Sequence, residues 1–145
     1  MELDSLYQEV ILDHYKHPQN KGLSAIFSAQ VSHVNTSCGD EIVLNLLLED
    51  TVITSLTWEG QGCSISQASV SIMSDLLKGK TLDEAQIIIK NFSELMASKG
   101  TSTGDALVLE DAVAFAGVSK FPGRIKCSLL GWMAFKDAAI QAQAQ

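Results

Sequence analysis

Hydrophobic positions first recur at helical spacing near the start of the chain. The stripe consists of Leu3, Leu6, Tyr7, Val10, Ile11 and His14. Offsets of three and four place these side chains on one face of an amphipathic helix. Pro18 disfavours helical backbone at the residue before it, so the helix should end near His17. Residues 19–28 show no regular pattern and predict a loop.

Three short segments with strand character follow this loop. They are residues 29–35, 41–49 and 51–59. The second is rich in Val, Ile and Leu, whereas the third alternates, which should place Val52, Thr54, Leu56 and Trp58 on one face. Little more than Asp50 separates the last two segments, so they should form a tight hairpin.

The pattern becomes helical after residue 62. Ser64 and Gln67 have the spacing of a capping box, which predicts a helix that begins at Ser64 and runs to residue 79. Thr81 and Glu84 have the same spacing and should begin a second helix that ends near residue 97. Both helices therefore follow the strands rather than alternate with them.

Two more helices are expected before the chain ends. Residues 99–104 form a polar, glycine-containing loop, and residues 105–116 should form the first of these helices. Phe121-Pro122 should open the last one, since proline fits the first turn of a helix. The Gln- and Ala-rich tail, residues 140–145, should fray. Segregated strands and helices predict an α+β fold, a small three-stranded antiparallel sheet with about five helices, mostly packed on one face.

Composition narrows the class of protein. The chain has 145 residues, of which 46% are hydrophobic, enough for one domain with its own core. The net charge of -7 argues against a nucleic-acid-binding protein, which normally has a basic surface. No apolar run approaches the length of a membrane span, and the first residues lack the pattern of a signal peptide. We therefore expect a cytoplasmic protein, with neither nucleic acid nor membrane as a partner.

The three cysteines are the residues that suggest a chemical function. An odd number argues against a disulfide framework, so the thiols are inert core residues, metal ligands or nucleophiles. Cys38 lies among turn-forming residues between two strands, where core packing explains a thiol poorly, although a chance loop cysteine is the simpler alternative. Cys63 directly precedes a predicted helix start, whose amides and dipole favour a thiolate, although a glycine-rich turn can contain a cysteine by chance.

Cys127 has the strongest structural alternative of the three. It lies early in the last predicted helix, where a cysteine often serves as a small buried hydrophobic residue. Arg124 and Lys126 lie close to it in the sequence, and nearby cations favour a thiolate. The sequence leaves both interpretations of Cys127 open.

Together with Asp40, the cysteines offer three sulfurs and one carboxylate. This is a tetrahedral zinc ligand set, and thiolates equally bind iron–sulfur clusters. The spacing is too long to be a zinc-finger pattern and is weak evidence by itself. His14, His17 and His33 could compete as ligands, but His14 lies on the apolar stripe and His17 at a helix end.

At these residues the chain resembles the U-type iron–sulfur cluster assembly family (SufU/IscU-like). The matching stretches are residues 6–22 (including DHYKHPQNKG), 37–40 (SCGD), 60–69 (GQGCSISQAS) and 117–127 (GVSKFPGRIKC). The resemblance covers nearly the whole chain, as one iron–sulfur assembly domain of residues 1–145 similar to the N-terminal domain of NifU. In the scaffold (IscU) branch a histidine directly precedes the third cysteine, whereas Lys126 stands here, as in the SufU branch.

The resemblance to the SufU branch implies a metal site and a sulfur-transfer activity. Zinc would be held by Cys38, Asp40, Cys63 and Cys127. The protein would accept sulfur from a pyridoxal-phosphate cysteine desulfurase, as a zinc-dependent sulfurtransferase, and pass it to downstream iron–sulfur assembly proteins. Cys38 would be the nucleophile, and Arg124 and Lys126 would face the partner. The alternative is a scaffold on which the same four ligands hold a transient [2Fe–2S] cluster.

Overall fold

The computed structural model describes residues 5–144, with side chains from residue 7 onward. Leu3 and the side chain of Leu6, both assigned to the first apolar stripe, lie outside the described part. The elements are α1 (Ser5–Lys16), β1 (Ala29–Asn35), β2 (Asp40–Glu49), β3 (Val52–Gln61), α2 (Ser64–Leu77), α3 (Leu82–Ala97), α4 (Ala106–Leu109), the 3₁₀ helix η1 (Glu110–Lys120) and α5 (Pro122–Gln143). Within the described residues, no helix has the length and apolar character of a membrane span.

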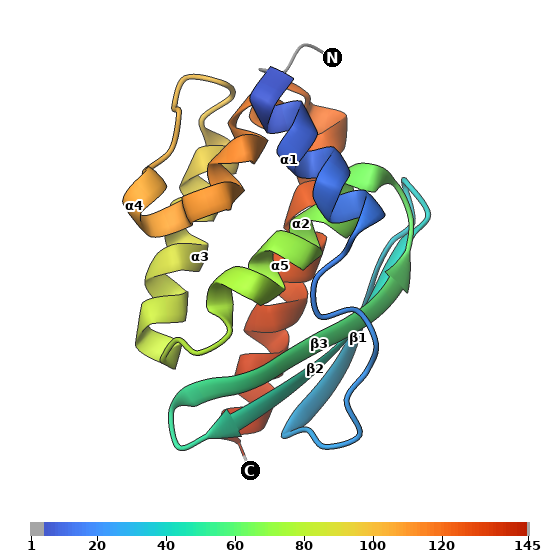
Figure 1. The fold of residues 1–145 in the computed structure, drawn as a ribbon, viewed down its shortest axis with the longest axis vertical. Coiled ribbons are helices and arrows are strands. Elements are labelled where there is room, and N and C mark those ends of the chain that lie inside the picture. Colours follow the sequence, from blue (N-terminus) through green and yellow to red (C-terminus); the bar gives the residue numbers. More distant parts are fainter. Residues whose placement is uncertain (1–4, 145) are drawn as a thin grey trace.

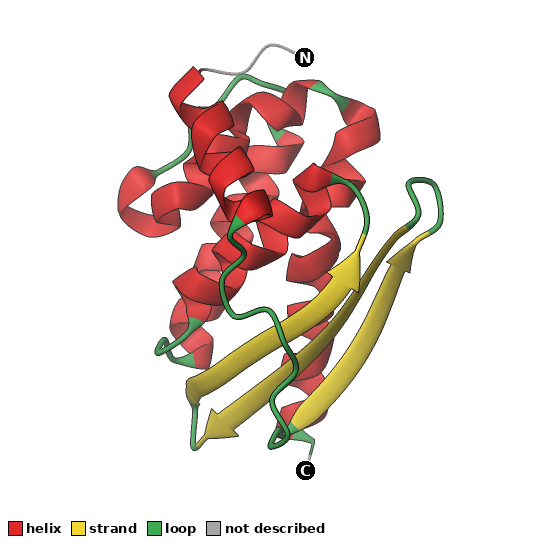
Figure 2. Cartoon of the chain, turned by 45° about the vertical axis from the view of Figure 1, so that its right-hand side comes forward, coloured by secondary structure: helices red, strands yellow, loops and turns green. Residues whose placement is uncertain are grey.

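The three strands form an antiparallel sheet in the order β1-β2-β3, and the helices gather on one side of it (Figures 1 and 2). Alternation along β2 directs Ile42, Leu44 and Leu46 into the core, where all three are fully buried. The long helix α5 packs across β1 and β2, and α2 packs against β3. The predicted α+β class and its one-sided packing are confirmed.

A bulge in β3 overturns the predicted face of this strand. Leu47 pairs with Ser55 but Leu48 pairs with Ile53, so Thr54 is an extra residue that shifts the alternation. Ile53, Leu56 and Trp58 are therefore the buried side chains, while Val52 and Thr54 are only partly buried. The predicted hairpin is present, with Asp50 at a positive φ of 58° in its turn.

The outer edge of β3 is covered by two other segments. Near the end of β3, residues 19–24, which we call the strap, run alongside it. The Trp58 amide donates to the Asn20 carbonyl at 3.1 Å and the Gly22 amide donates to the Trp58 carbonyl at 2.7 Å. Near the start of β3, the connection between α2 and α3 pairs with the strand. The Ile53 amide donates to the Lys80 carbonyl at 2.9 Å.

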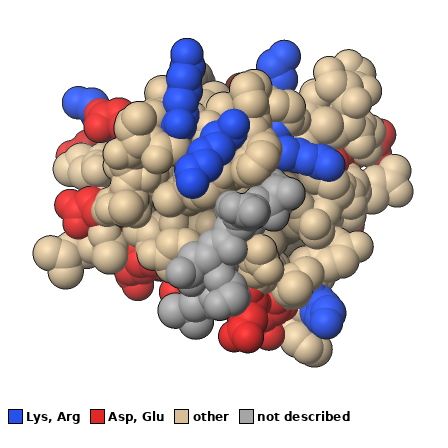
Figure 3. Space-filling model, turned by 90° about the horizontal axis from the view of Figure 1, so that it is seen from above, with Lys and Arg blue, Asp and Glu red and all other residues tan. Residues whose placement is uncertain are grey.

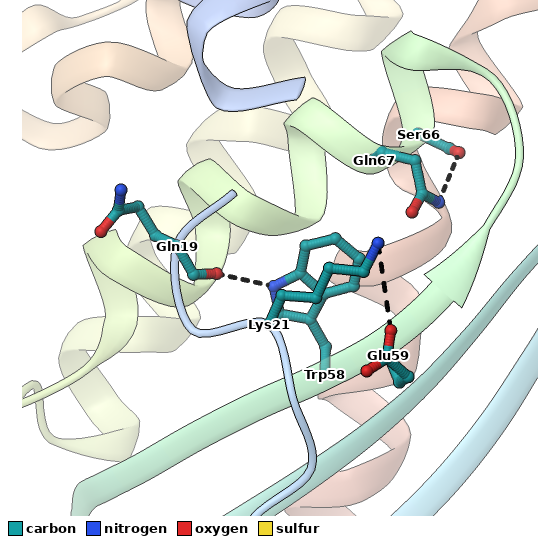
Figure 4. A network of polar contacts seen from close by, with 6 residues as sticks. All are labelled: Gln19, Lys21, Trp58, Glu59, Ser66 and Gln67. Carbon is teal, nitrogen blue, oxygen red and sulfur yellow. Dashed lines mark hydrogen bonds and ion pairs between the residues drawn. The ribbon is translucent and has the colours of Figure 1, made fainter. Parts of the chain in front are cut away.

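Side chains also fasten the strap to β3 (Figure 4). The buried Trp58 indole donates from Nε1 to the Gln19 carbonyl at 2.8 Å. The Lys21 ammonium lies 5.3 Å from the centroid of the Trp58 ring and 3.9 Å from a Glu59 carboxylate oxygen. The predicted loop is thus an ordered segment tied to the sheet.

The two predicted capping boxes have different outcomes. At α3 the box is present, since Thr81 Oγ1 accepts from the Glu84 amide at 3.1 Å and the Glu84 carboxylate accepts from the Thr81 amide at 2.9 Å. At α2 the prediction is wrong, because Ser64 is already the first helical residue and Cys63 is the N-cap, without a capping side-chain bond. The helix nevertheless begins at Ser64 as predicted.

The helix predicted for residues 105–116 is also wrong in kind. Only Ala106–Leu109 is α-helical, and Glu110–Lys120 forms a 3₁₀ helix. Glu110 adopts a positive φ of 48°, which breaks the α-helix at that point. In contrast, α5 begins at Pro122 as expected, and it continues to Gln143, so the tail through that residue is part of the helix.

Aromatic side chains join α3, η1 and α5 in the core. Phe92 stacks on Trp132 with ring centroids 4.0 Å apart, and Phe115 meets Phe92 edge-on. The Trp132 indole donates to Ser69 Oγ of α2 at 2.9 Å, and Ser69 Oγ donates to the Ser128 carbonyl of α5 at 2.6 Å. These contacts fix α5 against α2 one residue beyond Cys127.

Candidate metal centre

Cys38 lies in the turn that joins β1 to β2. Asn35 and Asp40 are paired in the strand register, which leaves residues 36–39 as the turn. The Asn35 carbonyl accepts from the Cys38 amide at 3.3 Å, and Gly39 adopts a φ of 69° that favours glycine. Cys38 is half-buried, so its thiol is at the surface end of the sheet, as expected from the turn-forming sequence.

Asp40 is the first residue of β2 and is fully buried. Its Oδ1 accepts from the Cys63 amide at 2.8 Å, and the Cys63 thiol lies 3.8 Å from Oδ2. The described residues form two ion pairs, Lys21–Glu59 and His33–Asp137, and neither includes Asp40. A buried carboxylate without a protein cation is costly, and a bound metal ion would compensate it.

Gly62 allows this carboxylate to lie where it does. Its φ is 146°, and a Cβ at this position would meet the Asp40 carboxylate and lie 2.9 Å from Asp40 Cα. Only glycine therefore accommodates Asp40 against the end of β3. The group that Gly62 admits is thus the Asp40 carboxylate, which also accepts the Cys63 amide.

Cys127 lies near the start of α5 and is fully buried. Burial is the main cause that raises the pKa of its thiol, and contacts with Cys38 and Asp40 raise it further. Arg124 and Lys126, predicted to favour the thiolate, are instead exposed on the helix surface.

The fold brings the predicted side chains to one place, although not equally closely. The ligand atoms of Cys38, Asp40 and Cys127 all lie within 4.8 Å of one another, and the two sulfurs are 3.0 Å apart. Cys63 lies outside that set but touches Asp40 through both its amide and its thiol. Three thiols and one carboxylate suit tetrahedral zinc, so the residues present fit that ion.

The histidines lie elsewhere. His14 Nδ1 and Ser71 Oγ are 2.8 Å apart, and His33 pairs with Asp137 at 3.0 Å, which holds the pKa of Asp137 below its ordinary value. The described residues contain no metal-type cluster with a histidine. The packed role expected for His14 agrees with its hydrogen bond.

Asn35 is a site residue that sequence reasoning missed. Its side-chain amide donates to Cys127 Sγ at 3.8 Å, in addition to its backbone bond to Cys38. A polar residue that ends a strand just before a cysteine turn was the available signal. Its proximity to Cys127, 92 positions away, is visible only in the fold.

Comparison with known proteins identifies the family. The model described as NifU-like N terminal domain matches residues 6–128. The chain is 45% identical over 97% of its length to the zinc-dependent sulfurtransferase SufU of Bacillus subtilis (strain 168), covering 94% of that protein. It is 39% identical over 94% of its length to the iron–sulfur cluster assembly scaffold protein IscU of Streptococcus pyogenes serotype M1, covering 84% of that protein.

A solved structure supports the fold independently. The N-terminal part of a nitrogen-fixing NifU-like protein from Brucella abortus superposes with a TM-score of 0.86 over 96% of this chain and 95% of that chain, at 24% identity. At that identity the likeness establishes the fold alone. Together with the sequence matches, it shows that the chain belongs to the NifU-like N-terminal domain family of iron–sulfur cluster assembly proteins, with SufU and IscU as its relatives.

Proposed function

We propose that this protein is a zinc-binding sulfur acceptor, which takes persulfide sulfur from a pyridoxal-phosphate cysteine desulfurase and passes it to iron–sulfur cluster assembly. The observation that carries the proposal is the convergence of Cys38, Cys127 and the buried Asp40 within 4.8 Å, where Asp40 has no ion pair among the described residues. The 45% identity to a zinc-dependent sulfurtransferase supports it. Residues 1–145 would act as one domain.

The ligands of the zinc ion would be Cys38, Asp40, Cys63 and Cys127. When bound, zinc keeps its ligand sulfurs deprotonated and compensates the charge of Asp40. The protein supplies the shape of the site, since Gly62 admits the Asp40 carboxylate and the Cys63 amide orients it. Asp40 is the one oxygen donor, a harder ligand than a thiolate and hence the place for ligand exchange.

Cys38 is the proposed nucleophile. It is half-buried on a turn, whereas Cys127 is fully buried in a helix. The Cys38 thiolate attacks the outer sulfur of the persulfide on the partner's cysteine. A new S–S bond forms to Cys38, the S–S bond within the partner breaks, and the partner's cysteine leaves as a thiolate. The product is a persulfide on Cys38, with no net oxidation or reduction.

Exposed cations near the site suit docking of the partner. Arg124 and Lys126 are exposed and lie within three residues of Cys127, and the stretch from residue 112 to residue 136 contains no acidic residue. Figure 3 looks onto the end of the molecule where α5 begins, and several Lys and Arg side chains lie on this face, with Asp and Glu side chains near its edges. We propose that Arg124 and Lys126 contact acidic groups of the desulfurase.

The test uses Cys38→Ala with a desulfurase, and it measures both zinc content and stimulation of sulfide release. We expect a folded protein that no longer stimulates the desulfurase, because the nucleophile is gone. Ser37→Ala, in the same turn, is the matched control and should retain stimulation. Normal stimulation by Cys38→Ala would contradict the assignment of Cys38 as the sulfur acceptor.

A scaffold role is the second candidate, supported by the 39% identity to an IscU scaffold protein. The same four residues would then hold a [2Fe–2S] cluster during its assembly. Anaerobic reconstitution with iron and sulfide distinguishes the two functions. A stable brown protein with cluster absorption would favour the scaffold, and a colourless zinc protein favours sulfur transfer.

A further inference from the structure

Asn35 lies between the two parts of the chain that form the site, the β1–β2 turn and the start of α5. It is the last residue of β1 and pairs in register with Asp40, the first residue of β2. Its side chain is half-buried and reaches toward the start of α5. One residue therefore lies next to the Cys38 turn, Asp40 and Cys127.

Two hydrogen bonds from this residue join the two cysteines. The Asn35 carbonyl accepts from the Cys38 amide at 3.3 Å, which closes the turn. The Asn35 Nδ2 amide donates to Cys127 Sγ at 3.8 Å. The backbone bond survives any change of side chain, whereas the second bond depends on the amide.

The other polar neighbours of the buried Cys127 sulfur are Cys38 Sγ at 3.0 Å, the Gly123 carbonyl at 3.8 Å, and the side chains of Asp40 and Cys63. The thiol proton can serve only one of them at a time. A sulfur that ligates a metal has lost that proton and can only accept. Among the described residues, Asn35 is then the only side-chain N–H donor to this sulfur.

We propose that Asn35 is a positioning residue for the metal centre, which donates a hydrogen bond to the ligand sulfur of Cys127 and holds it beside the Cys38 turn. This inference rests on the proposed function, because it assumes that Cys127 is a metal ligand. Hydrogen bonds to ligating groups orient them and tune the metal, and their loss typically weakens metal binding about 10–100-fold. Asn35 supplies a neutral donor where Arg124 and Lys126 face solvent.

Asn35→Leu isolates the amide. Leucine has nearly the same shape, keeps the backbone bond to Cys38 and cannot donate to sulfur. Its new side chain would face a shallow hollow of about 300 Å³ lined by Val34, Leu129, Leu130 and Met133 with Lys126, so apolar packing is available. Gln30→Leu is the matched control. Gln30 lies on β1, the strand of Asn35, but at its other end, and the change removes its side-chain amide bond to Asn45 of β2.

The experiment measures zinc affinity by competition with a chelator, and the spectrum of the cobalt-substituted protein. We expect zinc to bind Asn35→Leu about 10–100-fold more weakly than wild type, with Gln30→Leu unchanged. The thiolate-to-cobalt charge-transfer band of Asn35→Leu should move to longer wavelength, because a sulfur without its hydrogen bond gives up electrons more easily. A role confined to the fold would leave that band in place.

The outcomes separate this inference from the proposed function. Equal zinc affinity and an unshifted cobalt band in Asn35→Leu would overturn the role of Asn35 while leaving the metal site intact. A wild-type protein that binds neither zinc nor cobalt would overturn the proposed function and this inference with it. Weak zinc binding by Asn35→Leu, combined with normal stimulation of the desulfurase by Cys38→Ala, would support Asn35 and refute only the sulfur-transfer step.

Discussion

The position of the Asp40 carboxylate depends on the backbone of the two residues beside it, Gly62 and Cys63. The absence of a Cβ at Gly62 leaves the space that the Asp40 carboxylate fills, and the next residue along, Cys63, donates its amide to that carboxylate. The aspartate is thereby buried, yet aimed at two sulfurs. A change at a residue with no ligand atom should therefore disturb the ligand set.

Gly62→Ala tests this dependence. The added methyl would overlap the Asp40 carboxylate at a φ of 146°, so we expect a loss of both zinc and stability. Gly79→Ala is the control, since Gly79 also has a positive φ of 86° but has nothing within 4 Å of an added Cβ. That variant should lose about 1–2 kcal/mol of unfolding free energy from backbone strain alone and keep its zinc. Urea unfolding and metal analysis measure both quantities, and full zinc content in Gly62→Ala would refute the argument.

Cys63 and Cys127 are expected to be metal ligands, so their replacement should lower the stability of the whole domain. Serine at either position should strip the metal and lower the melting temperature of the zinc-loaded protein, because metal-binding free energy contributes to folding free energy. Metal analysis and thermal unfolding with and without a chelator would measure it. If both variants retained a full zinc ion, neither residue would belong to the ligand set.

The candidate site was largely predictable from residue types, but its geometry was not. Cys38 and Cys63 were expected at the ends of elements, and both lie there. That Cys127 would reach them depends on how α5 crosses the sheet, and Asn35 could be found only after that crossing is known. The exposure of Arg124 and Lys126 follows from the rotation of α5 about its axis, which local sequence does not fix.

At the scale of elements, sequence signals predicted the structure correctly where the interactions that form it lie within one short segment. The Thr81 cap is such a case, because both of its hydrogen bonds lie within four residues. The bulge at Thr54 and the 3₁₀ helix of residues 110–120 were missed, because strand register and core packing decide them. The alternation of apolar and polar residues along β3 does not reveal the position of a bulge that shifts it.

Thr81→Ala should therefore weaken α3 specifically. Removal of the capping oxygen leaves the Glu84 amide without its partner, at a cost of about 0.5–2 kcal/mol in unfolding free energy. Thr101→Ala, a threonine in the loop after α3, is the comparison and should cost less. Chemical unfolding measures both, and equal costs would show that the cap contributes nothing particular.

The same cap should give a pH dependence. Hydrogen bonds from Thr81 hold the pKa of the Glu84 carboxyl below its ordinary value of 4.5. A lowered pKa in the folded state means that the charged carboxylate stabilises the fold above the ordinary value, and that this contribution disappears as pH falls through the lowered pKa. The stability difference between wild type and Glu84→Gln should therefore shrink on acidification from neutral pH. Glu94→Gln, which removes a charge from the same helix outside its cap, is the matched control.

At the scale of the molecule, charge is unevenly distributed. Seventeen acidic residues outnumber ten Lys and Arg, yet Lys120, Arg124 and Lys126 all fall in the acid-free stretch that contains Cys127. Cations of this kind increase the rate and specificity of docking to an acidic partner. An overall acidic protein therefore carries exposed cations close in sequence to its candidate ligand Cys127.

Arg124→Ala should retain zinc and fold but weaken association with the desulfurase, by about 1–3 kcal/mol for a lost charged hydrogen bond. Arg124→Lys should recover only part of this, because lysine cannot reproduce bidentate contacts. Lys90→Ala, an exposed lysine on α3, is the control. Titration against the desulfurase at two salt concentrations would measure the effect, and wild-type affinity and stimulation in Arg124→Ala would return it to an ordinary surface charge.

The covering of β3 has a consequence for how copies of this protein meet. An exposed edge strand offers free amides and carbonyls to any other strand, which is a common route to aggregation. Here the strap pairs with β3 at Trp58 and the α2–α3 connection pairs with it at Ile53, so this edge has few such groups left to offer. Loosening the strap, for example by losing the Lys21–Glu59 and Trp58–Gln19 contacts, would expose a template for intermolecular strand addition. Pairing of the strap with β3 thus leaves fewer free backbone groups through which two copies could join.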